Sequence, residues 1–348
     1  EMQRSLVGSE MCIRDSNKRS TFSGKLGFVL SAAGASVGLG NIWRFPYLAA
    51  KYGGGIFLLI YIVLALTFGY TMIIAETTLG RMTKKSPVGA FHTFAKTKFA
   101  SFSGWINAII PILIVPYYSV IGGWVIKYLF EYLKGDAKLL ATDTYFSNFI
   151  SNGVSTEICF ILFTLFTLAI IYAGVQNGIE RVSKFMMPVL VVLSVIIAGY
   201  SISRPGAFEG VKYFLIPNFD NFSWMTVVSA MGQMFYSLSI AMGILITFGS
   251  YMKKDVSIEG STENVEIFDT AIAIMAGLMI IPAVFSFSGG NMETLKAGPS
   301  LMFITIPKVF ASMGLGTGIG IIFFLLVLFA AITSSIALTE SAVSTFQD

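Results

Sequence analysis

The feature that most constrains this chain is a series of apolar runs that are longer than the core of a soluble domain requires. Segments 57–74 and 321–332 are almost continuously apolar, whereas the strands of a membrane barrel alternate apolar and polar residues. Such runs predict helices that cross a bilayer. The composition agrees, because 55% of the 348 residues are apolar and only 12% are charged, against about 25% charged residues in soluble proteins. The predicted fold class is therefore an all-α membrane protein.

The length leaves room for about eight spanning helices, at roughly 20 residues for each helix and as many for each connection. The candidate segments are 22–51, 54–82, 104–134, 156–174, 182–203, 223–252, 264–288 and 317–346. Residues 1–16 show neither the apolar stretch of a signal peptide nor a helical pattern. We expect them to be a non-native leader and exclude them from the fold.

The basic residues predict how the chain lies in the membrane. Lysines and arginines gather in the loop 81–98 and just before the first span, as is typical of cytoplasmic segments. We therefore expect a multi-pass protein of the cell's inner (plasma) membrane with a cytoplasmic amino terminus, and loops 135–155, 204–222 and 289–316 outside. The apolar stretch 301–307 in the last loop is too short to span, which favours a re-entrant or capping element that could act as a lid.

Several function classes are disfavoured by composition. A net charge of +4 is too small to suggest nucleic acid as a partner. Cys12 and Cys159 lie in unlike segments and offer no disulfide framework. His92 is the only histidine in the sequence, so a zinc site or a histidine proton relay would need ligands that the chain lacks.

Two of the apolar segments contain small residues that weaken helix continuity. The first contains AGASVGLGN at 33–41 and the sixth contains SLSIAMG at 237–243, where glycine and serine favour a break. Interrupted helices at matching positions of two halves indicate a binding site near the middle of the bilayer. The alternative is that Gly34 and Gly38 only allow close helix packing, as in a G-x-x-x-G contact.

Three features inside spans suggest specific chemistry. The hydroxyl cluster Thr333, Ser334 and Ser335 offers oxygens that suit a hard cation such as sodium, although such hydroxyls more often bond to a carbonyl one turn earlier. Asp269 begins an apolar run, where a bound cation would stabilise its carboxylate. The alternative for Asp269 is an interfacial acid that reaches the cytoplasm. Arg44 follows the first break and fits either a gate or a structural ion pair.

Residues 34–38, GASVG, also match the G-x-S-x-G pattern of serine hydrolases. That mechanism needs a strand-to-helix elbow and a histidine base. Here the motif interrupts a membrane helix, and the single histidine lies in the basic loop. Hydrolysis at Ser36 is therefore the weakest of the functional hypotheses, and no enzymatic activity is expected.

The motif GLGNIWRFPY at 38–47 resembles the first-helix signature of the neurotransmitter:sodium symporter family. The resemblance continues at 53–55, 117–118, 178–181, 233–239 and 333–335, and extends over residues 19–348. It is strongest toward the bacterial amino-acid branch. It implies an inverted repeat of five plus five helices with helices 1 and 6 unwound at mid-membrane, usually within twelve helices. Residues 17–203 would form the first repeat and 204–348 an incomplete second one, as in a product truncated after the eighth helix.

The resemblance implies two sodium ions as cofactors. The first would be bound by the carbonyl of Ser36, the side chains of Asn41, Ser237 and Asp269, and the substrate carboxylate. The second would be bound by backbone carbonyls and hydroxyls of Gly34, Val37, Ala330, Thr333 and Ser334. Family members often have asparagine in place of Asp269, and chloride-dependent members have serine in place of Ala273. We therefore expect no chloride requirement.

The substrate class follows from Gly38, where monoamine members of the family carry an aspartate and amino-acid members leave space. The resemblance implies a substrate site that meets the amino-acid carboxylate, its ammonium group and a mostly apolar side chain. Its residues would be Ala35, Ser36, Leu39, Gly40, Ile114, Tyr118, Tyr236, Ser237, Ser239, Met242, Ser334 and Leu338.

Gates are implied in the same way. The outer gate would consist of Arg44, Gln233, Tyr118 and Tyr236. The inner gate would consist of Arg19, Phe22, Ser250, Tyr251 and Asp348, with Arg19 paired to Asp348. The expected function is sodium-coupled symport of neutral, hydrophobic or aromatic amino acids by alternating access in a lipid bilayer, and assembly into a homo-oligomer is compatible with it. The alternative is an amino-acid-binding membrane sensor that binds sodium without transporting.

Overall fold

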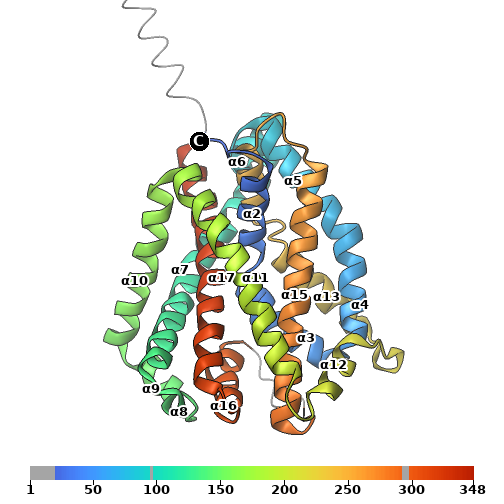
Figure 1. The fold of residues 1–348 in the computed structure, drawn as a ribbon. Coiled ribbons are helices and arrows are strands. Elements are labelled where there is room, and N and C mark those ends of the chain that lie inside the picture. Colours follow the sequence, from blue (N-terminus) through green and yellow to red (C-terminus); the bar gives the residue numbers. More distant parts are fainter. Residues whose placement is uncertain (1–19, 95–96, 292–297) are drawn as a thin grey trace, which may run out of the picture.

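The computed structural model describes residues 20–94, 97–291 and 298–348, which fold into a bundle of helices (Figure 1). Within these ranges there is no strand, only a single bridge between Gly54 and Pro217. The predicted all-α class is confirmed. Arg19 lies outside the described residues, as does the expected leader.

Long apolar helices account for most of the predicted spans. In the described ranges six are long and apolar enough to cross a bilayer. They are α4 to α5 (Gly55–Thr83), α7 (Lys98–Lys134), α10 (Gly153–Tyr172), η3 to α11 (Val175–Ile202), α15 (Glu259–Ser288) and α17 (Gly316–Gln347). The π-helical turns η2 (Ala65–Gly69) and η3 (Val175–Glu180) lie within the first and fourth of these.

The two segments predicted to be interrupted are both broken. In the first, α2 (Lys25–Ser36) and the pair η1 (Gly40–Arg44) and α3 (Phe45–Lys51) form a span bent by 51°. In the sixth, α13 (Trp224–Ser237) and α14 (Ile244–Ser250) are separate short helices. Ser239 and Ala241 between them have φ values of 56° and 61°, a left-handed conformation that is uncommon for residues with a side chain. The predicted segment 223–252 is therefore not one helix.

Short helices lie at the two ends of the bundle. The described residues of loop 81–98 and the carboxyl end share one end, and those of loops 135–155, 204–222 and 289–316 share the other, as the predicted topology requires (Figure 1). Helix α6 (Pro87–Phe94) and the carboxyl end lie at one end, and α8 (Ala137–Leu140), α9 (Tyr145–Ser151), α12 (Ala207–Leu215) and α16 (Ile306–Ala311) lie at the other (Figure 1). The single turn η4 (Phe219–Asn221) follows α12. In the loop expected to cap the bundle, η6 (Leu301–Thr305) and α16 are short and largely buried. The loop therefore caps the bundle rather than crossing it.

Helix α17 occupies the centre of the bundle and packs against α7, α11, α10 and α2. Its buried face runs almost its whole length, whereas only Cys159, Phe163, Thr167 and Ile170 of α10 are buried. Since the bilayer gives no hydrophobic drive for helices to associate, close packing has to hold them together. The pair α5 (Tyr70–Thr83) and α14 shows this, because Gly80 and Gly249 let the two backbones touch. A Cβ on Gly80 would overlap the carbonyl of Ile246, and one on Gly249 the carbonyl of Thr77.

This contact predicts that Gly80→Ala lowers the stability of the protein. The added methyl group would meet backbone rather than a movable side chain, and overpacking of this kind costs about 1–3 kcal/mol. The melting temperature in detergent, followed by tryptophan fluorescence, should fall. Gly199→Ala is the matched control, because a Cβ there meets nothing within 4 Å. Equal melting of the two variants would contradict the packing argument.

Candidate functional site

A cavity lies where the two broken spans face α7 and α17. It contains about 350 Å³ of space not filled by atoms, a volume that includes open solvent. Its wall consists of Ala35, Ser36, Gly38, Leu39, Gly40, Asn41, Ile114, Tyr118, Tyr236, Ser239, Met242, Ile244, Ser334 and Leu338. Every predicted substrate residue lines it except Ser237. Ile244 was not predicted, since an isoleucine in an apolar helix carries no signal of a site.

Polar groups fix the first break against the scaffold around this cavity. The Leu39 amide donates to the Tyr118 hydroxyl at 3.1 Å, and the Ser239 hydroxyl lies 3.4 Å from the Ala35 carbonyl. Gly38 lies where Ser334 and Tyr118 pack directly against the first break. A Cβ on Gly38 would lie 2.5 Å from Ser334 Oγ and 2.8 Å from the Tyr118 hydroxyl.

Asp269 is the centre of a polar cluster beside the cavity. Its side chain is fully buried, so it does not reach the cytoplasm. Its carboxylate accepts hydrogen bonds from Asn41 Nδ2 at 2.8 Å, Ser237 Oγ at 2.7 Å and the Tyr61 hydroxyl at 3.2 Å. No lysine or arginine of the described ranges lies within ion-pair distance of it. A buried carboxylate without a counter-charge is costly, and a bound cation would offset that cost.

The oxygens of this cluster fit a hard cation. Asn41 turns its amide nitrogen to Asp269 and leaves Oδ1 buried without a hydrogen-bond partner. Ser237 does not line the cavity; its hydroxyl donates to Asp269, so it belongs to the Asp269 cluster. Tyr61 was not predicted, because it lies in a continuous apolar run that reads as lipid-facing. Ser36 lines the cavity, and its hydroxyl donates back to the Ala32 carbonyl at 3.2 Å.

A second set of oxygens converges on Ser334. Its hydroxyl lies 3.3 Å from the Gly34 carbonyl, 3.2 Å from that of Ala35 and 3.4 Å from that of Val37. Thr333 bonds instead to the carbonyls of Phe329 and Ala330, at 3.0 and 3.2 Å. The alternative of local back-bonding therefore holds for Thr333, whereas Ser334 reaches across to the broken span. All five residues predicted for the second sodium site lie together here.

Aromatic and polar side chains separate the cavity from an outer vestibule. The Arg44 guanidinium lies 5.1 Å from the centre of the Tyr236 ring, and Gln233 Nε2 donates to the Gly40 carbonyl at 3.1 Å. The vestibule above them has about 770 Å³ of open space and is lined by Trp43, Arg44, Tyr47, Leu48, Tyr117, Tyr236 and Gly298. In the described part of the chain Arg44 stacks on an aromatic ring and has no acidic partner, so the ion-pair alternative is not realised there.

On the opposite side, Phe22 closes the bundle. It is 1% exposed, its ring meets those of Phe248 and Tyr251 at 5.6 and 6.1 Å, and its amide donates to the Tyr251 carbonyl at 3.0 Å. The Tyr251 hydroxyl donates to Glu340 at 2.5 Å. Ser250 bonds within its own helix, to the Thr247 carbonyl at 2.6 Å. Asp348 accepts from the Ser86 amide, and the predicted partner Arg19 is outside the described residues.

Comparison with known proteins gives a family match over nearly the whole chain. The profile described as "Sodium:neurotransmitter symporter family" matches residues 19–143 and 145–348. An uncharacterized sodium-dependent transporter of Bacillus subtilis is 36% identical over 327 residues, which cover 93% of this chain and 72% of the relative. The sodium- and chloride-dependent glycine transporter 2 of Xenopus laevis is 28% identical over 412 residues, which cover 96% of this chain and 52% of that protein.

A solved structure is also similar over nearly the whole chain. The crystal structure of MhsT in complex with L-phenylalanine superimposes with a TM-score of 0.85 at 38% sequence identity. The similarity covers 95% of this chain and 75% of that one. The likeness therefore extends to all the helices that enclose the cavity.

The Asp269 cluster predicts that Tyr61→Phe destabilises the protein. The change removes one of the hydroxyl donors to a fully buried carboxylate, and hydrogen bonds to charged groups contribute about 1.5–3 kcal/mol. Thermal unfolding in potassium buffer should report the loss. Tyr172→Phe is the control, since that residue is 95% exposed. An unchanged melting temperature for Tyr61→Phe would show that Asp269 does not depend on this donor.

Proposed function

The chain belongs to the sodium:neurotransmitter symporter family, and on this premise we propose that it couples sodium entry to the uptake of neutral, hydrophobic or aromatic amino acids by alternating access. The match to MhsT confirms the predicted fold. The first span (α2 to α3) and the sixth span (α13 to α14) are both broken in this structure. The family consists of sodium-dependent transporters, so the chain is a multi-pass membrane protein. Placement in the inner membrane with a cytoplasmic amino terminus is part of the proposal.

One observation carries the proposal. The cavity between the two breaks adjoins a fully buried Asp269 that has hydrogen-bond donors but no cationic side chain beside it in the described ranges. A cation bound there would supply the missing charge. An amino-acid carboxylate in the cavity could then share that cation. Substrate and ion would each stabilise the binding of the other, which is the coupling that symport requires.

The first sodium site is proposed to use the Ser36 carbonyl, Asn41 Oδ1, the Ser237 hydroxyl and Asp269. The free Asn41 Oδ1 supports it, because a buried oxygen without a partner is costly unless a ligand meets it. The second site is proposed at the carbonyls of Gly34, Val37 and Ala330 with the hydroxyls of Thr333 and Ser334. Purely oxygen ligands suit a hard cation such as sodium.

Substrate recognition follows from the two kinds of surface in the cavity. The carboxylate would meet the first sodium, the amides of Leu39 and Gly40, and the Tyr118 hydroxyl. The ammonium would meet backbone carbonyls at both breaks. Ile114, Met242, Ile244 and Leu338 make the remaining wall apolar, which favours a hydrophobic side chain. Such a wall separates substrates that differ by one methylene by only about 1–3 kcal/mol.

Alternating access would use the two closures already described. The aromatic pair Tyr118 and Tyr236 would cover the substrate from the vestibule, and Phe22 would cover it from the cytoplasm. The proposed motion rocks one group of spans against another. The first group is spans 1, 2, 6 and 7, which are α2 to α3, α4 to α5, α13 to α14, and α15. The second group is spans 3, 4 and 8, which are α7, α10 and α17. One charge crossing 100 mV gives about 2.3 kcal/mol, and a tenfold sodium gradient adds about 1.4. Two ions would thus supply roughly 7 kcal/mol, enough for about 10⁵-fold accumulation.

The proposal predicts that the purified chain binds labelled leucine, tyrosine or tryptophan in sodium but not in potassium. Chloride should be replaceable by gluconate without loss, since Asp269 already carries a negative charge in the first site. Uptake into vesicles against a gradient would distinguish a symporter from a sensor that only binds. Binding that ignores sodium would contradict the proposed ion sites, and a chloride requirement would contradict the role of Asp269.

Asp269→Asn should raise the sodium concentration needed for half-maximal binding by about tenfold or more, because the site loses its full charge; tenfold corresponds to about 1.4 kcal/mol. Glu263→Gln is the matched control, since Glu263 is an exposed acid on the same helix. The measurement is a sodium titration of substrate binding. An unchanged titration for Asp269→Asn would place the coupled sodium elsewhere.

Gly38→Ala should weaken substrate binding by about tenfold or more. Its methyl group would need Ser334 and Tyr118 to move, and such overpacking costs about 1–3 kcal/mol. Equilibrium binding in saturating sodium measures the effect. Gly232→Ala on α13 serves as the control, because nothing lies within 4 Å of its Cβ position. Equal affinities would show that the space beside Gly38 does not receive the substrate.

A further inference from the structure

Glu180 is a buried carboxylate outside the cavity and outside both proposed sodium sites. It is 2% exposed and ends the π-helical turn η3. Its carboxyl group contacts three parts of the structure, two of which lie far from it in sequence. These are the residues before α2, the first turns of α2 itself, and α11 (Arg181–Ile202).

The residues that precede α2, 20–24, are here called the strap. Phe22 of the strap fills the space between Phe28, Phe248 and Tyr251 and closes the cytoplasmic side. Residues 20–24 lie outside any helix, and among them only the Gly24 carbonyl takes part in a helical bond, from the Phe28 amide at 3.2 Å. The position of the strap therefore depends on contacts with other elements.

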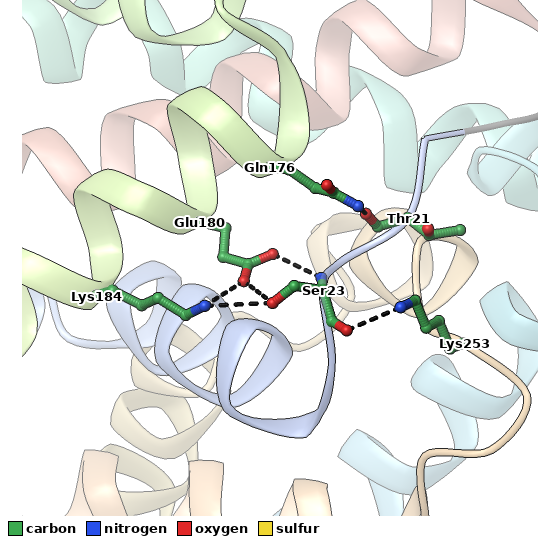
Figure 2. A network of polar contacts seen from close by, with 6 residues as sticks. All are labelled: Thr21, Ser23, Gln176, Glu180, Lys184 and Lys253. Carbon is green, nitrogen blue, oxygen red and sulfur yellow. Dashed lines mark hydrogen bonds and ion pairs between the residues drawn. The ribbon is translucent and has the colours of Figure 1, made fainter.

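Ser23, the residue after Phe22, provides those contacts (Figure 2). Its amide donates to Glu180 Oε2 at 2.8 Å, and its hydroxyl donates to Glu180 Oε1. Its carbonyl accepts from Lys253 Nζ at 2.8 Å. Gln176 adds a bond to the Thr21 carbonyl at 2.6 Å. The carboxylate thus receives two hydrogen bonds from one residue, which are stronger than neutral ones because the acceptor is charged.

Lys184 fixes the carboxylate in this position. Its Nζ lies 2.5 Å from Glu180 Oε1, one turn along the same helix, and 3.2 Å from Ser23 Oγ. Figure 2 shows Glu180 and Lys184 projecting from one helix toward Ser23. Gly27 in the first turns of α2 also packs directly on Glu180, because a Cβ there would overlap the carboxyl group. The strap and the start of α2 are therefore both held by one side chain.

The same helix reaches the proposed second sodium site. Met187 is buried on α11, two turns beyond Glu180, and its sulfur lies 3.4 Å from the Cβ position of Gly34. Thr333 lies 3.2 Å from that position. One continuous helical segment, η3 with α11, thus contacts the strap at one point and the first break at another.

We propose that Glu180 is the latch of the cytoplasmic gate, a positioning residue that keeps the strap and α2 closed until its bonds to Ser23 are broken. This inference rests on the proposed function, because a gate is meaningful only in a protein that opens. It assigns the closing energy to a charged group at the side of the gate in addition to the aromatic contacts of Phe22. Loss of the carboxylate should therefore favour the open state even when every aromatic residue is intact.

The test measures opening directly, through a cysteine at Ser31. Ser31 lies on α2, is 2% exposed, and its hydroxyl has no hydrogen-bond partner, so Ser31→Cys removes no hydrogen bond. The background carries Cys12→Ser and Cys159→Ala. A membrane-impermeant maleimide should label the Ser31→Cys variant slowly in sodium. Glu180→Gln should raise that rate about tenfold, which corresponds to about 1.4 kcal/mol, and Ser23→Ala should raise it by a smaller factor.

The matched control is Glu131→Gln on α7. Glu131 is likewise buried and lies 2.5 Å from a lysine four residues away, Lys127, yet it has no bond to the strap. Equal labelling of the parent and Glu180→Gln would overturn the latch. So would an equal increase in Glu131→Gln, which would indicate general loosening. If Glu180→Gln does not fold, the same comparison is made with Ser23→Ala, and an unchanged rate there overturns the latch.

Substitution of potassium for sodium in the parent separates the two proposals. Faster labelling in potassium would show that sodium favours closure, as the proposed function requires. A sodium-insensitive rate in the parent would count against the ion sites, whereas the comparison of Glu180→Gln with the parent would still decide the latch.

Discussion

The constraint on which the rest of this structure depends is the need to satisfy backbone groups that two broken helices leave free inside a membrane. A polar group in lipid without a partner costs several kcal/mol. The first break leaves the carbonyls of Gly34, Ala35 and Val37, and the Ser334 hydroxyl, which has one proton to donate, lies within 3.2 to 3.4 Å of all three. The Leu39 amide is met by Tyr118 and the Gly40 carbonyl by Gln233. These partners are also the groups that would contact an ion or a zwitterion, so stability and binding use the same atoms.

The buried charge of Asp269 adds a second demand, which hydrogen bonds meet only in part. Ser237, Asn41 and Tyr61 come from three different elements, and their donors orient the carboxylate. Hydrogen bonds stabilise an ionised group but do not neutralise it. Under the proposed function, a cation at this cluster would supply the missing positive charge. This explains why the cluster adjoins the cavity, because a ligand carboxylate can share the ion.

Much of this arrangement could be predicted from the sequence, and the exceptions have physical reasons. Glycine and serine runs predicted both breaks, since these residues destabilise helices wherever they occur. The residues that line the cavity, apart from Ile244, were predicted from the resemblance to the family rather than from composition or periodicity. The segment 223–252 is interrupted at 238–243 as expected, but the left-handed backbone conformations of Ser239 and Ala241 in that break could not be predicted from their side chains. Tyr61 and Ile244 lie in apolar runs where period and composition cannot tell a lipid-facing residue from a cavity-facing one.

Glu180 shows a further limit of sequence reasoning. Its spacing to Lys184 predicts an ordinary pair within one helix, of the kind that contributes little at a surface. Only the fold brings Ser23 and Gly27 against it, more than 150 residues away in sequence. Because α11 continues from Glu180 to Met187 beside Gly34, one helical segment contacts both the first break and the strap. Under the proposed function, coupling between a sodium ion at the first break and the strap would run through this one helical segment, because it contacts both.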